Sequence, residues 1–380
     1  MTISLPDLLL ICLFLLILYV YIGYPVLLWL LTRRAQAGVL LTGDVNPSIS
    51  LIITAHNEIE VIEQKIQNTL VLTYPKEFLE IIVASDGSDD GTDEAVLRYA
   101  DAGVRLHRLP KRVGKMPALM DAVTGASGEI FVFSDANAMY EPDALTHLIE
   151  PFRDERVGCV CGKLLYVNPS DNSISDGERM YWDYENRIKG WESRFNTLIG
   201  ANGSIYALRR SAYTPLGPDL SDDYGFPLAA YALGYRAVYQ PSAVSREEAP
   251  ATVFAEFKKK SRFVSHQLTT MSHLWSRLNP IHNSRLLFQI VSHKLLRNFV
   301  PFYLIGILAV TFQATPPVSC FLAWGQAIFY GLALCGLVTH RLGISLKLFT
   351  IPLYFCTVNA AAAVGVFQFL WKRNYAAWDD

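Results

Sequence analysis

The strongest constraint on the fold is an almost uncharged stretch near the beginning of the chain. Between Leu5 and Leu31 the only charged residue is Asp7. A helix of about 20 apolar residues crosses a bilayer, so this stretch can span one, and it is too long for a signal-peptide core. Arg33 and Arg34 follow almost at once. We therefore predict an uncleaved anchor whose carboxyl end faces the cytoplasm, because basic residues favour that side.

Comparable apolar stretches return only near the end of the chain, at residues 299–313, 318–338 and 347–370. The part between has the composition of a soluble domain and is long enough for one α/β domain with its own core. The predicted parts are a transmembrane anchor at 1–34, a cytoplasmic α/β domain at 45–265, amphipathic interfacial helices at 266–297 and transmembrane helices at 298–372.

The segment from His282 to Arg297 shows an amphipathic pattern. One side of the helix carries the apolar residues Leu287, Val291 and Leu295. The other side carries the polar residues Arg285, Gln289, His293 and Arg297. Such a helix can lie in the bilayer interface. Three crossings after it would place Lys372 and Arg373 outside, against the positive-inside tendency, whereas two would place them inside. The sequence leaves the side of the carboxyl terminus open.

Charge and cysteine usage exclude some classes of function. The net charge is −2 and the isoelectric point is near 6.5, so bulk charge does not favour nucleic acid as a partner. Cys159 and Cys161 alternate on one predicted strand, a spacing that is not a zinc signature and is typical of core packing. The histidines form no HExxH motif.

Short runs rich in β-branched and apolar residues alternate with helix-like patterns in the soluble part. The predicted strands are residues 48–53, 80–84, 104–107 and 130–133, with helices opening at Glu58 and covering residues 117–123. Strands that alternate with helices form parallel sheets, which bind ligands outside the carboxyl ends of their strands. The polar residues that follow these strands are therefore the candidate site.

Oxygen-bearing side chains follow the last of these strands. Asp135 and Asn137 alternate along an extended segment, so their side chains point the same way, about 7 Å apart. Two such oxygens can share one hard cation with the phosphates of a substrate. Asp86, at the tip of another strand, can hydrogen-bond a base or a ribose. The turns are neither GxGxxG nor a Walker A loop, which disfavours dinucleotides and P-loop chemistry.

A series of motifs over residues 45–265 resembles family 2 glycosyltransferases, which include bacterial exopolysaccharide, cellulose and hyaluronan synthases. The motifs are AxNE at 55–58, SDGSxDGT at 85–92, GKxxAL at 114–119, SDAN at 134–137, GANG at 200–203, SDD at 221–223 and a degenerate (Q/R)xxRW at 259–263. The apolar segments at both ends of the chain also fit this family.

The resemblance implies a GT-A fold, an α/β nucleotide-diphospho-sugar transferase domain, with flanking transmembrane and interfacial helices. It implies inverting transfer from a nucleotide-sugar donor, with UDP as the nucleotide and a divalent metal, Mg²⁺ or Mn²⁺, as cofactor. The acceptor would be a lipid-linked saccharide or a growing polysaccharide. The protein would lie in a bacterial inner membrane, with the catalytic domain in the cytoplasm.

The resemblance also assigns roles to individual residues. The expected general base is Asp223, with Asp222 as the alternative, because a carboxylate near the acceptor hydroxyl can take its proton. The expected donor-binding residues are Ala55, Asn57, Glu58, Asp86, Gly87, Lys115, Asp135 and Arg262. The expected acceptor-binding residues are Asn202, Gly203 and Trp182, and the expected metal ligands are Asp135 and Asn137.

Two departures from the family pattern shape the alternatives. Asn137 stands where the family has a second Asp, which removes one negative charge, although an amide oxygen can still ligate a metal. Lys259 and Phe263 replace the Gln and Trp of (Q/R)xxRW, which favours a single addition over a processive polysaccharide synthase. An inactive, nucleotide-binding membrane scaffold is the alternative of another class, and only Asn137 supports it.

Overall fold

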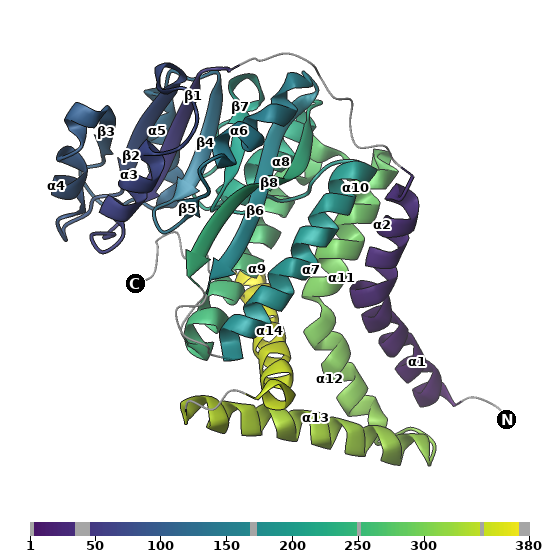
Figure 1. The fold of residues 1–380 in the computed structure, drawn as a ribbon. Coiled ribbons are helices and arrows are strands. Elements are labelled where there is room, and N and C mark those ends of the chain that lie inside the picture. Colours follow the sequence, from purple (N-terminus) through teal and green to yellow (C-terminus); the bar gives the residue numbers. More distant parts are fainter. Residues whose placement is uncertain (1–3, 35–45, 168–172, 249–251, 343–345, 372–380) are drawn as a thin grey trace.

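The computed structural model describes residues 4–34, 46–167, 173–248, 252–342 and 346–371, with side chains from Met180 onward in the helix that begins at Ser173. The α/β domain forms the upper left of Figure 1, and helices from both ends of the chain extend below it. Lys372 and Arg373 lie outside the described residues.

An eight-stranded mixed sheet forms the centre of the domain, in the order β3-β2-β1-β4-β7-β6-β8-β5. Its strands are β1 (Ile49–Ala55), β2 (Leu79–Ser85), β3 (Val104–Arg108), β4 (Ile130–Asp135), β5 (Met139–Tyr140), β6 (Val157–Val167), β7 (Tyr206–Arg209) and β8 (Arg236–Glu248). The first four predicted strands are confirmed and run parallel, whereas β7 is antiparallel to both β4 and β6. The carboxyl ends of β1 and β4 therefore meet at one edge, with Thr54 opposite Asp135.

Helices cover both faces of this sheet because successive strand residues point to opposite sides. Ile53 packs in the cluster of α3 (Ile62–Leu70), α4 (Thr92–Leu97) and α6 (Ala144–Ile149). Phe133 faces α5 (Lys115–Thr124), α8 (Asp222–Ala232) and α9 (Val253–Leu278). Its ring stacks on Phe226 of α8 at 5.5 Å. The long helix α7 (Ser173–Phe195) joins β6 to β7, and short 3₁₀ turns lie at 76–78, 100–102, 150–153, 210–212 and 280–282.

The helix predicted to open at Glu58 begins later, at Ile62. The N–H group of Asn57 donates to the Ser88 hydroxyl at 3.2 Å. The N–H group of Glu58 donates to the Thr92 hydroxyl at 2.8 Å. The Asn57 backbone is also left-handed, with φ of 55°. Hydrogen bonds to Ser88 and Thr92 of the neighbouring loop hold the backbone of Asn57 and Glu58 out of helical geometry. Strand β1 is therefore followed by a turn, and the helix begins only at Ile62.

The predicted membrane segments are helical. The anchor comprises α1 (Leu5–Leu18), a π-helical turn (Tyr19–Gly23) and α2 (Tyr24–Thr32), and α12 (Val300–Thr311), α13 (Val318–Arg341) and α14 (Lys347–Leu370) follow the domain. By length and composition, three described helices can cross a membrane, namely residues 5–32, 318–340 and 347–370. A bent pair, residues 284–298 and 300–311, makes a fourth candidate if it is counted as one span.

The predicted amphipathic segment turns its polar side towards the protein. It comprises α10 (Ser284–Gln289), a π-helical segment η7 (Ile290–Leu295) and α11 (Leu296–Asn298). Gln289 and His293 are almost fully buried, and His293 lies 2.8 Å from Glu192 of α7. Arg297 forms an ion pair with Glu185, also on α7. The polar residues satisfy buried carboxylates of the domain, which a pattern on one helix does not disclose.

The domain core continues into the helices outside the α/β domain. Phe133 of the sheet belongs to the same buried cluster as Ile290 of η7 and Val366 of α14. Close packing of α14 on α9 requires Gly365, because a Cβ there would lie 2.6 Å from the carbonyl oxygen of Ser261. The α/β domain and α14 therefore form one packed body.

Substituting Gly365 by Ala should lower stability by about 1–3 kcal/mol, the typical cost of overpacking, because α14 must move away from α9. Thermal unfolding of the purified protein in detergent measures the effect. Gly331→Ala on α13 is the matched control, since a Cβ there meets nothing within 4 Å. Equal melting temperatures for the two variants would contradict tight α9–α14 packing.

Candidate active site

A cleft of about 340 Å³ opens at the carboxyl ends of β1 and β4. The predicted site residues that line it are Glu58, Lys115, Asp135, Asn137, Trp182, Asn202, Gly203, Asp222, Asp223 and Arg262. The sheet supplies Asp135, and the first turns of α5 and α8 supply Lys115 and the two adjacent aspartates. The fold thus brings together residues that are far apart in the sequence.

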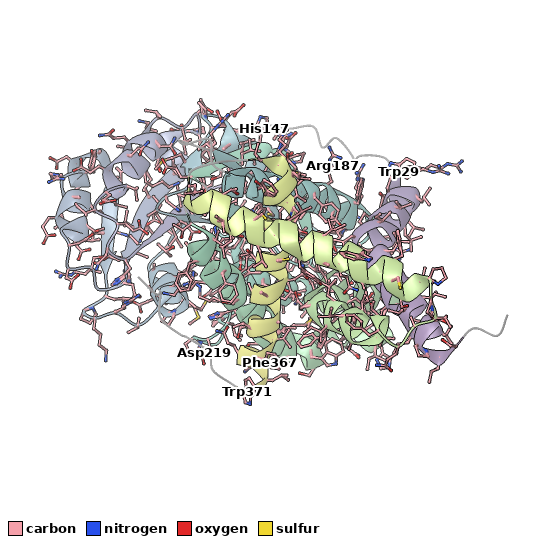
Figure 2. The ribbon with its side chains drawn as sticks, turned by 90° about the horizontal axis from the view of Figure 1, so that it is seen from below. Trp29, His147, Arg187, Asp219, Phe367 and Trp371 are labelled. Carbon is pink, nitrogen blue, oxygen red and sulfur yellow. The ribbon has the colours of Figure 1, made fainter. Side chains whose placement is uncertain are left out.

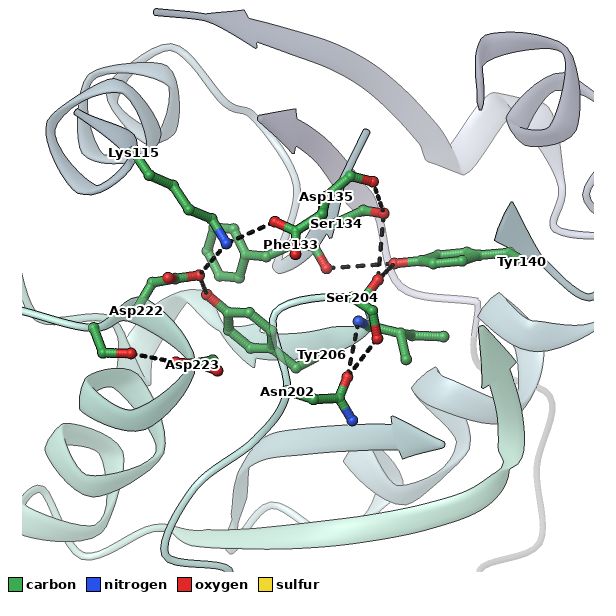
Figure 3. A network of polar contacts seen from close by, with 12 residues as sticks. Lys115, Phe133, Ser134, Asp135, Tyr140, Asn202, Ser204, Tyr206, Asp222 and Asp223 are labelled. Carbon is green, nitrogen blue, oxygen red and sulfur yellow. Dashed lines mark hydrogen bonds and ion pairs between the residues drawn. The ribbon is translucent and has the colours of Figure 1, made fainter. Parts of the chain in front are cut away.

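Lys115 links two carboxylates across the cleft (Figure 3). Its Nζ lies 2.7 Å from Asp135 Oδ1 and 3.3 Å from Asp222 Oδ2. Burial opposes the charged form, but Asp135 and Asp222 outweigh it and raise the pKa of Lys115. Lys115 therefore stays positively charged at neutral pH, beside the carboxylate of Asp135 at the end of β4.

The two adjacent aspartates of α8 have different surroundings. Asp222 accepts a hydrogen bond from Tyr206 Oη at 2.8 Å and pairs with Lys115 (Figure 3). Asp223 accepts a hydrogen bond from Ser221. Burial and then the neighbouring Asp222 raise the pKa of Asp223 to about 6. A carboxylate with a pKa just below neutrality is suited to take a proton from a hydroxyl group.

Negative charge accumulates around the cleft. Burial raises the pKa of Glu58 to about 7, with Asp135 and Asp90 adding to the effect. Burial likewise raises the pKa of Glu247 to about 7, against the opposing charge of Lys259 and with a contribution from Asp135. Burial is the main cause of both shifts and Asp135 adds to each, so a cation bound at Asp135 would favour the ionised forms of Glu58 and Glu247.

The donor set fits a divalent cation that is shared with phosphates. Asp135 and Asn137 line the cleft and offer oxygen atoms, the ligands that Mg²⁺ and Mn²⁺ prefer. Within the described part of the chain, no three His, Cys, Asp or Glu residues group closely enough to hold a metal alone. A metal here would share the oxygens of Asp135 and Asn137 with ligands from a substrate or water. Gly203 keeps the space open, because a Cβ there would lie 3.0 Å from Asp135 Oδ2.

Some predicted donor-binding residues lie behind the cleft. Asp86 is buried, and its carboxylate accepts the N–H groups of Val113 and Gly114, both at 2.7 Å. Gly87 has φ of 65° and packs against the backbone of Lys111. These contacts hold the loop that leads into Lys115, so Asp86 and Gly87 shape the site whether or not they also touch a donor.

Two further predicted donor-binding residues belong to the strand end and its turn. Ala55, the last residue of β1, is buried. Asn57 bonds to Asp89 through both side-chain atoms, its Nδ2 donating at 2.9 Å and its Oδ1 accepting at 3.0 Å. Neither Ala55 nor Asn57 is among the residues that line the cleft. Their donor-binding role stays a prediction.

The predicted acceptor-side residues differ in their availability. Asn202 is buried, and its amide donates to Gly162 O at 3.0 Å and accepts from Ser204 Oγ at 2.7 Å. Its hydrogen bonds hold the loop of Gly203 in place. Trp182 of α7 lines the cleft and packs edge-on against Tyr166 at 6.0 Å. A half-exposed aromatic ring at a cleft wall suits stacking on a sugar.

Sequence reasoning missed the buried Lys65. This lysine of α3 is fully buried, donates to the carbonyl oxygen of Ala138 and lies 3.9 Å from the centre of the Tyr140 ring. It therefore supports the turn that carries Asn137. The available signal was a lysine between Ile62 and Ile66 on the apolar face of a predicted helix.

Comparison with known proteins finds similarity over the α/β domain. Residues 50–217 match the family model described as glycosyl transferase family 2. The "Probable glycosyltransferase YdaM" of Bacillus subtilis is 26% identical over 258 residues, 64% of this chain and 61% of that protein. The "Poly-beta-1,6-N-acetyl-D-glucosamine synthase" of Staphylococcus aureus (strain COL) is 28% identical over 246 residues, 61% of this chain and 58% of that protein. The alignments thus span about three fifths of each relative.

A solved structure shares the fold. The mannosyltransferase PcManGT from Pyrobaculum calidifontis, in complex with GDP-Man and Mn²⁺, matches with a TM-score of 0.73 at 24% sequence identity. The match covers 97% of this chain and 100% of that one, so it includes the helices that flank the domain. It establishes a GT-A architecture for this chain.

Substituting Gly203 by Ala should weaken Mn²⁺ binding roughly tenfold, which corresponds to about 1.4 kcal/mol. The new Cβ would lie 3.0 Å from Asp135 and 3.1 Å from Lys115 Nζ, so one of them must move. Electron paramagnetic resonance of Mn²⁺ with UDP present measures the affinity. Gly325→Ala on α13, where a Cβ meets nothing within 4 Å, is the control. Unchanged affinity would place the metal away from Asp135.

Proposed function

We propose that the chain is a family 2 glycosyltransferase, because residues 50–217 match that family model. In this proposal it moves a sugar, with inversion, from a UDP-sugar to a lipid-linked saccharide at the cytoplasmic side of a bacterial inner membrane. The observation that carries this proposal is the position of Asp223, whose carboxylate lines the same cleft as the pair Lys115–Asp135. The candidate proton acceptor and the candidate phosphate-binding residues therefore face one partly enclosed cleft.

In this proposal the donor diphosphate lies beside Asp135. Asp135 and Asn137 would hold Mg²⁺ or Mn²⁺, and the solved mannosyltransferase, described with GDP-Man and Mn²⁺, supports this choice. A divalent ion supplies Lewis-acid stabilisation of the departing diphosphate. Lys115 lies close enough to add a second positive charge, and Arg262, on the cleft wall, can supply a third. Charge that develops on the leaving group is thereby offset inside a partly enclosed site.

The acceptor hydroxyl would react from the side of Asp223. Its oxygen forms the bond to the anomeric carbon while the bond from that carbon to the phosphate oxygen breaks, and the nucleoside diphosphate leaves with the electron pair. Asp223 takes the hydroxyl proton. The contacts favour Asp223 over Asp222, because Lys115 and Tyr206 already bind the Asp222 carboxylate.

A processive polysaccharide synthase is the second candidate, and the name of the Staphylococcus aureus relative favours it. The residues at the first and last positions of the (Q/R)xxRW motif favour a single addition. Lys259 donates to Tyr166 Oη at 2.8 Å, and Phe263 is a ring without a hydrogen-bond donor. The inactive scaffold loses ground in this proposal, because Asp135, Lys115 and Asp223 converge on one cleft.

The helices outside the domain support a defined topology. At one end of α12, the N–H of Thr315 donates to Asp7 at 3.1 Å, so α12 and α1 run in opposite directions. At its other end, Phe299 shares an apolar pocket with Leu370, the last residue of α14. In Figure 1, α13 lies across the lower ends of α12 and α14, and Figure 2 shows it crossing α14. We infer that α12 and α14 make two crossings after Arg297, which returns the chain to the side of the domain.

Asp223→Asn should lower turnover by roughly 10²–10⁴-fold, the range typical of a lost general base. Binding of UDP should stay unchanged, because the substitution preserves size and leaves Lys115 and Asp135 in place. Product formation from radiolabelled UDP-sugars by membranes, after lipid extraction, measures turnover. If Asp223→Asn transfers normally and Asp222→Asn is inactive, the role of base moves to Asp222.

The pH profile is the control for this role. A base must be ionised to act, and the pKa of Asp223 is raised to about 6. The value of kcat/KM should therefore fall as the pH drops below about 6 and level off above it. The residual activity of Asp223→Asn should lack this limb. A limb that persists in Asp223→Asn belongs to another group.

Transfer should require a divalent cation to offset the charge of the departing diphosphate. Asp135 and Asn137 supply few ligands, and the donor phosphates would complete the coordination shell of the ion. Washing membranes with excess EDTA should abolish transfer, and Mn²⁺ or Mg²⁺ should restore it. Undiminished transfer in EDTA would falsify the metal site, and Lys115 and Arg262 would then offset the charge without it.

With two crossings after Arg297, a cysteine introduced at Asp380 should be protected from an impermeant thiol reagent in intact spheroplasts and labelled after lysis. Asp380 itself lies outside the described residues. A cysteine at the exposed Gln313, in the same background with the native cysteines replaced, is the control for the outer side. Labelling at position 380 without lysis would mean three crossings.

A further inference from the structure

We propose that a second cavity, between α7, α9, η7 and α14, binds the phosphate group and the first alkyl segment of a lipid-linked acceptor. This cavity has a volume of about 310 Å³. It is separate from the catalytic cleft but adjoins it, and it lies where the candidate membrane helix α14 meets the domain. The proposal rests on glycosyl transfer at the neighbouring cleft and names the class of acceptor.

One side of the cavity is apolar and belongs to α14. Ile351, Phe355, Val358 and Ala362 of this helix line it. Ile351 is half exposed, with 50% of its surface accessible, so the apolar wall reaches the outer surface of the helix. Since α14 is long and apolar enough to cross a membrane, an alkyl chain lying along this wall would continue into the bilayer.

Cations from two segments also line the cavity. Lys260 of α9 and Lys294 and Arg297 of the η7–α11 segment line it. Arg297 pairs with Glu185, and Lys260 lies 3.4 Å from Glu256. No hydrogen bond or ion pair joins Lys294 to another residue in the part of the chain that the structure describes. The carboxylates that act on its charge, Glu185 and Glu192, already pair with Arg297 and His293, so the Lys294 ammonium beside an apolar wall favours an anionic ligand.

The cavity and the catalytic cleft share their boundary. Phe263 lines both of them. On α9, Lys259 lines the cleft and the next residue, Lys260, lines the cavity. On α7, Trp182 lines the cleft and its neighbour Tyr181 lines the cavity. A phosphate held by Lys294 would therefore present the group attached to it to the cleft that contains Asp223.

The chemistry of the lining favours a lipid phosphate over a sugar chain. Sugar hydroxyls need free hydrogen-bonding groups, and the lining amides are partly engaged. Asn298 donates to Gln267 Oε1 at 3.0 Å. Asn359 donates to the carbonyl oxygen of Phe355 at 2.9 Å. An amphiphile with an anionic head and an apolar tail matches one cationic and one apolar wall, and a polyprenyl diphosphate is such a molecule.

Binding of farnesyl diphosphate, a short isoprenoid diphosphate, to the purified full-length protein in nanodiscs tests the proposal. Saturating UDP and Mn²⁺ occupy the catalytic cleft, so that isothermal titration reports on the cavity. We expect farnesyl diphosphate to bind at least tenfold more tightly than farnesol or inorganic diphosphate, because each of these engages one wall only. Lys294→Met should weaken farnesyl diphosphate at least tenfold and leave farnesol unchanged.

Lys347→Met, an exposed lysine at the start of α14, is the matched control and should bind like the wild type. Val358→Trp fills the apolar side without changing any charge and should weaken farnesol and farnesyl diphosphate together. Melting temperatures near that of the wild type show that the variants are folded.

Three results would overturn the proposal: equal affinities for farnesyl diphosphate and farnesol, wild-type affinity in Lys294→Met, or displacement of farnesyl diphosphate by a soluble oligosaccharide that binds more tightly. Metal-dependent transfer from UDP-sugars in native membranes, which supply the acceptor, separates this proposal from the proposed function. Transfer in membranes without farnesyl diphosphate binding in nanodiscs removes the lipid site alone. Absence of transfer with every UDP-sugar tested removes the proposed function.

Discussion

The double ion pair of Lys115 is the interaction on which the catalytic cleft depends. One ammonium group offsets Asp135, from the end of β4, and Asp222, from the first turn of α8. The Lys115 and Asp135 side chains are only about a quarter exposed, so removing Lys115 would leave two carboxylates close together in the cleft without a compensating charge. Lys115 therefore fixes the distance between the strand that would hold the metal and the helix that carries Asp223. The same charge is available to the diphosphate, so the group that organises the cleft also takes part in its proposed chemistry.

A second buried network fixes the domain on its flanking helices. Glu192 of α7 accepts a hydrogen bond from Tyr24 of the anchor at 2.6 Å and lies 2.8 Å from His293 of η7. One carboxylate thus joins three segments that are far apart in the sequence. Burial opposes the ionisation of Glu185 on the same helix, but Arg297 and His293 hold its pKa well below the usual range. Each buried charge in this network has a partner, without which its burial would be costly.

The parallel strands could be predicted from local patterns. β-Branched runs end on polar residues, and parallel topology brings those ends together, which places Asp135 at the edge that binds ligands. The roles of Lys115 and Asp223 came from the resemblance to family 2 glycosyltransferases, because neither follows a strand. The late start of α3 could not be predicted, because Ser88 and Thr92 of a neighbouring loop bind the N–H groups at Asn57 and Glu58. The inward polar side of η7 depends on carboxylates of α7, and no pattern within one helix records its tertiary partners.

The arrangement along α9 bears on how many sugars one acceptor can receive. A lipid phosphate held in the second cavity would keep a fixed distance from Asp223, because Lys294 and the catalytic cleft belong to one packed body that includes α9 and α14. Each added sugar would then push the acceptor end past the cleft. A growing polymer could stay in register with the cleft only if its lipid phosphate moved through the cavity. That movement requires a cavity without a cation that holds the phosphate in one position. In this proposal, the ammonium of Lys294 and the ring of Phe263 at the boundary would favour a single addition for each binding event.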